Sequence, residues 1–147
     1  MKIERIDHLH FYVKDLESTI EKFADLLGLE FQEVTGLEKW GIIGIKDAVA
    51  SPGFDVIQPT TDPTLLKLIE SKGEGLHGVS FKVSDIDEAI EELKSKGIKL
   101  LWKYRFGSLT EALFESPDFF GVALELCEYP GDDINAAYYG QPTDSRG

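Results

Sequence analysis

The chain has little cysteine and no long apolar stretch. Cys127 is the single cysteine among 147 residues, so no internal disulfide can form and no paired Cys/His zinc motif exists. No apolar run approaches the roughly 18 residues of a membrane-spanning helix. The opening residues, MKIERIDH, are too charged for a secretory signal. We therefore expect a cytoplasmic protein with no membrane association.

Positive charge is also scarce. The chain carries 15 lysine and arginine residues against 27 aspartate and glutamate residues, which gives a formal net charge of −12. This balance excludes nucleic acid and anionic membrane surfaces as partners, because their phosphates would be repelled. A small anionic substrate is still compatible, since one bound cation or one arginine can dominate the local field.

The order of the predicted elements repeats within the chain. Apolar residues recur with helical spacing in 15–28 and again in 85–97, and each stretch begins with aspartate and ends with glycine. One strand precedes each helix and three follow it. The segment IDHLHFYVKDLE aligns with LHGVSFKVSDID at an offset of 70 residues. The predicted strands are 6–13, 29–35, 39–47, 53–59, 75–83, 98–106, 110–116 and 121–129, and 63–73 is a linking helix.

A chain of this length suits one domain. We expect a single α+β domain over residues 1–130, built from two pseudo-symmetric βαβββ modules at about 4–60 and about 74–130. The tail 131–147 is rich in Gly, Pro, Asp and Ser, so we predict that it is loop-like or partly disordered. Its two tyrosines, Tyr138 and Tyr139, could pack onto the domain or onto a second subunit.

Two of the three histidines, His8 and His10, share one face of the first predicted strand, because side chains alternate along a strand. They are either half of a metal site or two polar residues on a solvated face. Imidazole exchanges protons near neutral pH, so His10 is a candidate acid/base. The third histidine, His77, is expected on the outer face of its strand, against a helix or solvent.

The last predicted strand carries one carboxylate among apolar residues. Leu124 and Leu126 alternate to one face, which leaves Glu125 and Cys127 on the other. A carboxylate is costly to bury unless it meets a cation or a hydrogen-bond donor, so Glu125 indicates a site. The alternative is an edge strand with a solvated face.

The aromatic residues of the chain could serve either a pocket or the core. The candidates for either place are Trp40, Trp102, Tyr104 and Phe106.

These segments resemble the vicinal oxygen chelate superfamily of glyoxalases, bleomycin resistance proteins and extradiol dioxygenases, and within it the methylmalonyl-CoA epimerase group. The resemblance covers about residues 5–130. It is carried by IDHLHFYVKDLE, FDVIQP, GEGLHGVSFKVSDIDEAIEELKSKGIKLL and FESPDFFGVALELCEYP. It implies the glyoxalase fold, in which the two modules form a half-open curved sheet around a cavity that holds a divalent metal.

The resemblance implies a metal held by His8, Asp55 and Glu125. In the epimerase pattern a GLHH segment supplies a further histidine, but this chain reads GLHG and has Gly78 at that position. Imidazole and carboxylate donors suit a divalent Fe, Mn, Co, Ni or Zn ion. The carboxylate base of the epimerase pattern has no clear counterpart in LEKWGIIGIKD at 37–47.

The resemblance therefore implies a metal-dependent isomerase, epimerase or lyase that chelates substrate oxygens and stabilises an enolate, with His10 as the acid/base. An Fe(II)-dependent dioxygenase is one alternative. A metal-free, drug-sequestering type of binding protein is another, and Gly78 favours it. The expected partners are a small-molecule substrate, anionic or aromatic, and a second copy of the chain in a homodimer.

Overall fold

The computed structural model describes residues 1–115 and 117–139. The chain forms two compact units. Unit one combines residues 1–7 with 78–147, and unit two comprises residues 8–77. Two strands, β1 (Ile3–Tyr12) and β5 (Gly75–Val83), contribute residues to both units. Each unit is therefore described by itself.

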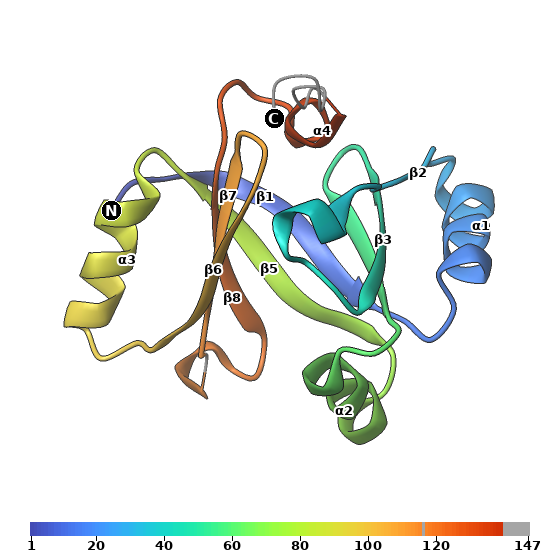
Figure 1. The fold of residues 1–147 in the computed structure, drawn as a ribbon, viewed down its shortest axis with the longest axis horizontal. Helices are drawn as coiled ribbons and strands as arrows, with labels where there is room; N and C mark the ends of the chain where they lie inside the picture. Colours follow the sequence, from blue (N-terminus) through green and yellow to red (C-terminus); the bar gives the residue numbers. More distant parts are fainter. Residues whose placement is uncertain (116, 140–147) are drawn as a thin grey trace. The chain divides into compact units, whose positions relative to one another are not determined.

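In unit two the strands lie in the order β2-β3-β4-β1. The β1–β4 pair is parallel, and the other two pairs are antiparallel. Helix α1 contacts β3 and β4, and α2 contacts β4 (Figure 1). The elements that begin in this unit are α1 (Leu16–Leu27), β2 (Gln32–Glu33), η1 (Leu37–Trp40), β3 (Ile45–Ala50), β4 (Phe54–Pro59) and α2 (Pro63–Lys72).

In unit one the strands lie in the order β5-β8-β7-β6, with a parallel β5–β8 pair and two antiparallel pairs. Helix α3 contacts β7 and β8, and α4 contacts β7. Among the residues described, no helix is long and apolar enough to cross a membrane. The remaining elements are α3 (Ile86–Ser95), β6 (Leu100–Phe106), β7 (Leu109–Phe114), η2 (Pro117–Phe119), β8 (Ala123–Glu128) and α4 (Ile134–Tyr139).

The predicted α+β class and the repeated βαβββ order are confirmed. Both long helices begin as the sequence predicts, because Asp15 accepts a hydrogen bond from Ser18 N–H and Asp85 accepts one from Glu88 N–H. Each helix also begins with a second hydrogen bond of the same kind. Leu16 N–H donates to the side chain of Gln58, and Ile86 N–H donates to the side chain of Glu128, at 2.8 Å in each case.

Two of the predicted strands are largely wrong. The strand expected at 29–35 is reduced to two residues, and the one expected at 39–47 begins only at Ile45, after a 3-10 turn. Glycines explain the difference. Gly41 adopts φ +77° at the end of the turn, and at Gly44 (φ +86°) a Cβ atom would lie 2.7 Å from the backbone nitrogen of Asp62. An apolar run interrupted by such glycines cannot pair as a continuous strand.

The described part of the tail contains a helix that the sequence does not predict. Residues 134–139 form α4, in which Ala137 and Tyr138 are buried. The Tyr138 ring lies 5.6 Å from the Phe106 ring of the same unit. Tyr138 therefore packs onto the domain, one of the two options left open by the sequence. The rest of the tail, 140–147, lies outside the described residues.

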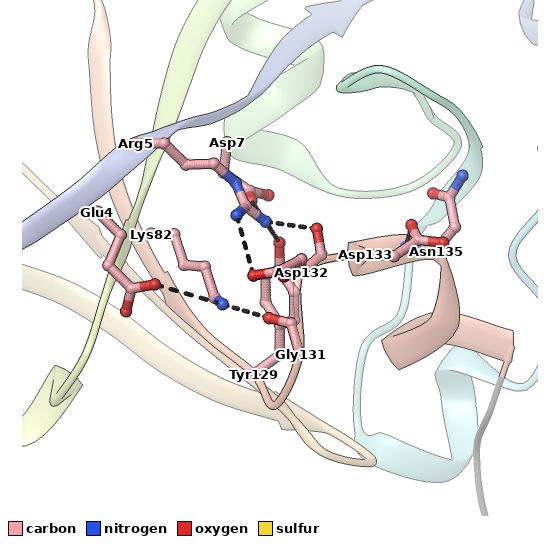
Figure 2. Close-up of polar contacts among 9 residues, drawn as sticks. All are labelled: Glu4, Arg5, Asp7, Lys82, Tyr129, Gly131, Asp132, Asp133 and Asn135. Carbon is pink, nitrogen blue, oxygen red and sulfur yellow. Dashed lines mark hydrogen bonds and ion pairs between the residues drawn. The ribbon is translucent and has the colours of Figure 1, made fainter.

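A polar network precedes α4 and ties it to β1 and β5 within unit one (Figure 2). The Tyr129 hydroxyl donates to the Asp7 carboxylate at 2.5 Å and accepts from Arg5. Arg5 also donates to the Asp132 carbonyl. The buried Lys82 ammonium lies 4.4 Å from the Tyr129 ring centroid and forms an ion pair with Glu4. The Lys82 ammonium also donates a hydrogen bond to the Gly131 carbonyl.

Burial raises the pKa of the Tyr129 phenol well above its usual value, and the hydrogen bond to Asp7 and the charge of Asp7 raise that pKa further. A phenol whose pKa is raised on folding adds stability below its unfolded pKa of about 10, and that stability is lost as the pH rises beyond it.

We predict that Tyr129→Phe lowers the free energy of unfolding by about 1–3 kcal/mol at pH 8, because buried Asp7 loses a hydrogen-bond donor. The difference from wild type should shrink at pH 11, where the unfolded wild type gains stability by ionising this phenol and the variant does not. Urea denaturation at both pH values measures this. An equal difference at the two pH values would contradict the role assigned to Tyr129.

Candidate functional site

Both strand histidines of unit two are buried. His8 and His10 are only 3% and 4% exposed, and their ring centroids lie 4.7 Å apart. A ring nitrogen of His8 lies within 4.8 Å of a ring nitrogen of His10. The solvated alternative is therefore wrong. Two imidazoles at this separation can act on one small ligand.

His10 is paired with a buried carboxylate of the neighbouring strand. His10 in β1 lies directly opposite Asp55 in β4. The His10 Nδ1 atom lies 3.8 Å from Asp55 Oδ2. A carboxylate beside one ring nitrogen orients the imidazole and leaves the other nitrogen for a ligand or a proton. Asp55 lies in the strand that the sequence predicts at 53–59, and it is buried.

A second buried carboxylate of unit two escaped the sequence analysis. Asp47 lies in β3 opposite Ile57, which in turn lies opposite Tyr12. Side chains at alternate positions share a face, so Asp47 and Asp55 are on the same side of these strands as His10. Asp47 also lines a recess of about 200 Å³. The available signal was an acid among apolar residues in IKDAVA, but the strand expected at 39–47 put that acid at a strand end.

In unit one, Glu125 occupies the face that its sequence pattern predicts. Leu126 is part of the core cluster that packs with α3, and Leu124 packs against that cluster. Glu125 is on the opposite face and is 4% exposed. Cys127, on the same face, is a buried free thiol. The solvated-edge alternative for this strand is therefore wrong, although the role of Glu125 as a metal ligand stays a prediction.

Unit one also contains a buried carboxylate that the sequence analysis missed. Glu111 in β7 is 1% exposed, and the Tyr104 hydroxyl donates to its Oε1 at 2.5 Å. The sequence signal was the alternation of Glu111 with the apolar residues on either side in LTEALF. The other aromatic candidates differ in placement: Phe106 packs in the core, whereas Trp40 and Trp102 are partly exposed.

The segment that differs from the epimerase pattern contributes no ligand at the expected position. Gly78 is buried and has no side chain to offer. The ring of His77 makes a contact of 2.7 Å with the carbonyl of Gly73, the residue that ends α2, and stacks on Tyr12. His77 therefore contacts a helix end, as expected from the sequence.

The donor chemistry of both units fits a divalent metal ion. Unit two offers two imidazoles and the Asp55 carboxylate, and unit one offers the carboxylates of Glu111 and Glu125. Nitrogen and oxygen donors of these kinds suit Mn, Fe, Co, Ni or Zn. The ligand set expected from the sequence, His8, Asp55 and Glu125, stays a prediction.

Comparison with known proteins identifies similar chains. A family model described as the glyoxalase/bleomycin resistance protein/dioxygenase superfamily matches residues 7–114. The chain is 28% identical over 137 residues to the uncharacterized protein YqjC of Bacillus subtilis strain 168, covering 90% of this chain and 98% of that one. It is 28% identical over 102 residues to the mitochondrial methylmalonyl-CoA epimerase of Mus musculus, covering 68% of this chain but only 57% of the mouse protein.

Two solved structures of similar proteins cover most of the chain. One is a Streptomyces coelicolor methylmalonyl-CoA epimerase in complex with 2-nitronate-propionyl-CoA, with a TM-score of 0.75 and 26% identity over 88% of this chain and 100% of that one. The other is the methylmalonyl-CoA epimerase of Mycobacterium tuberculosis, with a TM-score of 0.72 and 27% identity. The match covers 92% of this chain and 93% of that one. The glyoxalase fold expected from the sequence is confirmed.

We predict that the untagged protein binds Co(II) and that His8→Gln weakens this binding at least about tenfold, because an imidazole donor is lost. The matched control is His77→Gln, which removes a histidine that contacts the Gly73 carbonyl and should leave the affinity unchanged. Isothermal titration calorimetry measures the dissociation constants of the wild type and of the two variants. Equal affinities in all three proteins would show that His8 does not bind the metal.

Proposed function

Because the chain belongs to the glyoxalase/bleomycin resistance protein/dioxygenase superfamily, we propose that it is an epimerase-type enzyme that moves a proton at a carbon next to a carbonyl group. The methylmalonyl-CoA epimerases among its relatives support this reaction class. The observation that carries the proposal is the set of ionisable side chains buried on one face of unit two, His10, Asp55 and Asp47.

Epimerisation needs two groups that exchange protons with the substrate. One takes the proton from the carbon, whose electron pair moves onto the carbonyl oxygen to give an enolate. The other returns a proton to the opposite side of the same carbon. In our proposal His10 and Asp47 are these two groups. Both lie on one face of unit two, where water is largely excluded.

The neighbours of His10 support this role. Asp55, 3.8 Å from His10 Nδ1, holds the ring in one orientation and stabilises it when it is protonated. Asp47 is buried and lines a recess together with Val34, Leu37 and Ile45.

A bound divalent metal would supply electrostatic stabilisation of the substrate's oxygen atoms as negative charge develops on them. We propose that His8, Asp55 and Glu125 are the residues that hold it, as the resemblance implies. Their buried side chains are of the types that such ions prefer.

A thioester of coenzyme A is the first substrate to test. The Streptomyces coelicolor relative binds a propionyl-CoA derivative. The proton next to a thioester carbonyl is acidic enough for a general base to remove. In this proposal the enzyme acts in the cytoplasm as a homodimer, two expectations that rest on the sequence alone.

We predict that the protein exchanges the α-proton of methylmalonyl-CoA for deuterium in D₂O, followed by NMR. His10→Gln and Asp47→Asn should each lower the exchange rate by about 10²–10⁴-fold, because each removes one acid/base group. His77→Gln serves as the control and should retain the wild-type rate. Circular dichroism and thermal melts check that each variant is folded.

The outcome separates the proposal from its alternatives. Exchange that is absent in the wild type, with or without added metal, contradicts the epimerase proposal for this substrate class. Oxygen consumption with Fe(II) and a catechol would then support the dioxygenase. Tight binding of an aromatic compound without turnover would support the metal-free binding protein, the alternative that Gly78 favours.

A further inference from the structure

The two helices that pack on the sheet of unit one lie against opposite faces. Helix α3 packs against the face that carries Ala112 and Leu126. Helix α4 contacts β7 (Figure 1), and its Tyr138 ring lies 5.6 Å from the Phe106 ring. Phe106 lies opposite Leu109, which is an odd number of residues from Ala112 and therefore points to the other side. We call the face beneath α4 the α4 face.

The α4 face also carries a buried carboxylate. Tyr104 lies opposite Glu111 in the β6–β7 pair, just as Phe106 lies opposite Leu109. These residues alternate along their strands, so all four side chains are on the α4 face. Leu109 and Glu111 are 0% and 1% exposed. A movement of α4 would therefore uncover one end of a face that is otherwise closed to solvent.

The chain segment that leads to α4 is held firmly at its start. The Tyr129 hydroxyl donates to the buried Asp7 carboxylate, as Figure 2 shows. The Lys82 ammonium is buried as well, donates to the Gly131 carbonyl, and lies 4.4 Å from the Tyr129 ring centroid. Buried polar contacts of this kind fix the chain as far as residue 131.

Beyond residue 131 the attachment is weaker. The Arg5 guanidinium donates to the Asp132 carbonyl and lies 3.7 Å from the Asp132 carboxylate, which is 96% exposed, so water screens this ion pair. Helix α4 has six residues, too few to be stable alone. Its described side chains include two buried ones, Ala137 and Tyr138. A segment with so few buried contacts opens at a lower cost in free energy than the sheet beneath it.

Gly131 lies where the firm attachment ends. It adopts φ +80°, a region that glycine enters without strain. A Cβ atom at this position would meet nothing within 4 Å. The backbone conformation, rather than a lack of space, is therefore what favours glycine here.

We propose that α4 is a lid on the α4 face of unit one, hinged at Gly131. Two contacts hold the lid closed, that of Tyr138 with Phe106 and that of Arg5 with Asp132. When the lid opens, Phe106 and its neighbours on the α4 face become accessible while the sheet stays folded. The lid operates without a substrate and is independent of the proposed epimerase reaction.

The first experiment measures lid opening by the rate at which buried thiols of the full chain react with N-ethylmaleimide. Ala137→Cys places a thiol on the buried side of α4, and Leu109→Cys places one on the α4 face. Ala112→Cys and Leu126→Cys are the matched controls, because they make the same changes at buried positions on the α3 side. We expect both lid variants to react at least about 100-fold faster than their controls. The wild type, whose single thiol is the buried Cys127, gives the background rate.

The two lid positions together separate a lid from a frayed helix end. If Ala137→Cys reacts fast while Leu109→Cys reacts at the rate of its control, only the helix frays and the inference is overturned. Urea denaturation of each variant gives the rate expected from global unfolding. If all four variants react at that rate, α4 does not open independently and the inference is also overturned.

The second experiment tests the hinge in the Ala137→Cys protein. Gly131→Ala strains the closed conformation at positive φ, and opening relieves the strain, so the reaction should become about five- to thirtyfold faster. Gly97→Ala is the matched control, because Gly97 has φ +84° and equal space in the same unit. That control should leave the rate unchanged. Equal acceleration by both substitutions, or by neither, would contradict a hinge at Gly131.

Discussion

The burial of ionisable side chains is the constraint on which both units depend. A carboxylate or an imidazole inside a sheet loses its hydration, and the fold keeps it there only if a partner compensates. In unit two the partner of Asp55 is His10, its cross-strand neighbour. In unit one Asp7 is compensated by Tyr129 and Arg5.

The internal repeat shows how one scaffold acquires two chemistries. His10 lies opposite Asp55 in the parallel pair of unit two, and 70 residues later Ser80 lies opposite Glu125 in the parallel pair of unit one. The backbone pairing is the same, but an imidazole is replaced by a hydroxyl. Unit two thereby has a base beside its carboxylate, which suits proton transfer, whereas unit one has a hydroxyl at the equivalent place.

Most of the scaffold could be predicted because its signals are local. Asp15 and Asp85 cap their helices as the sequence indicates, and the alternation around Glu125 gives its buried face correctly. The strand predicted at 39–47 is wrong over most of its length, because its apolar residues resemble a strand while its glycines adopt positive φ. Helix α4 has six residues and depends on tertiary contacts such as Tyr138 with Phe106, which no local pattern reveals.

The candidate site was predictable only where two signals coincided. His8 and Glu125 combine strand alternation with a family resemblance. Asp47 and Glu111 have alternation alone, and a single acid within a strand reads equally well as a surface residue. Their burial depends on the packing of the folded chain rather than on the residues beside them in the sequence.

The central claim, that buried carboxylates of this fold bind a divalent cation, is tested most directly by anomalous diffraction from crystals of the untagged protein grown with Mn(II). The account predicts a peak at about 2.0–2.2 Å from carboxylate oxygens of the proposed ligands Asp55 and Glu125. A structure with no peak, or with a peak near neither carboxylate, would contradict it.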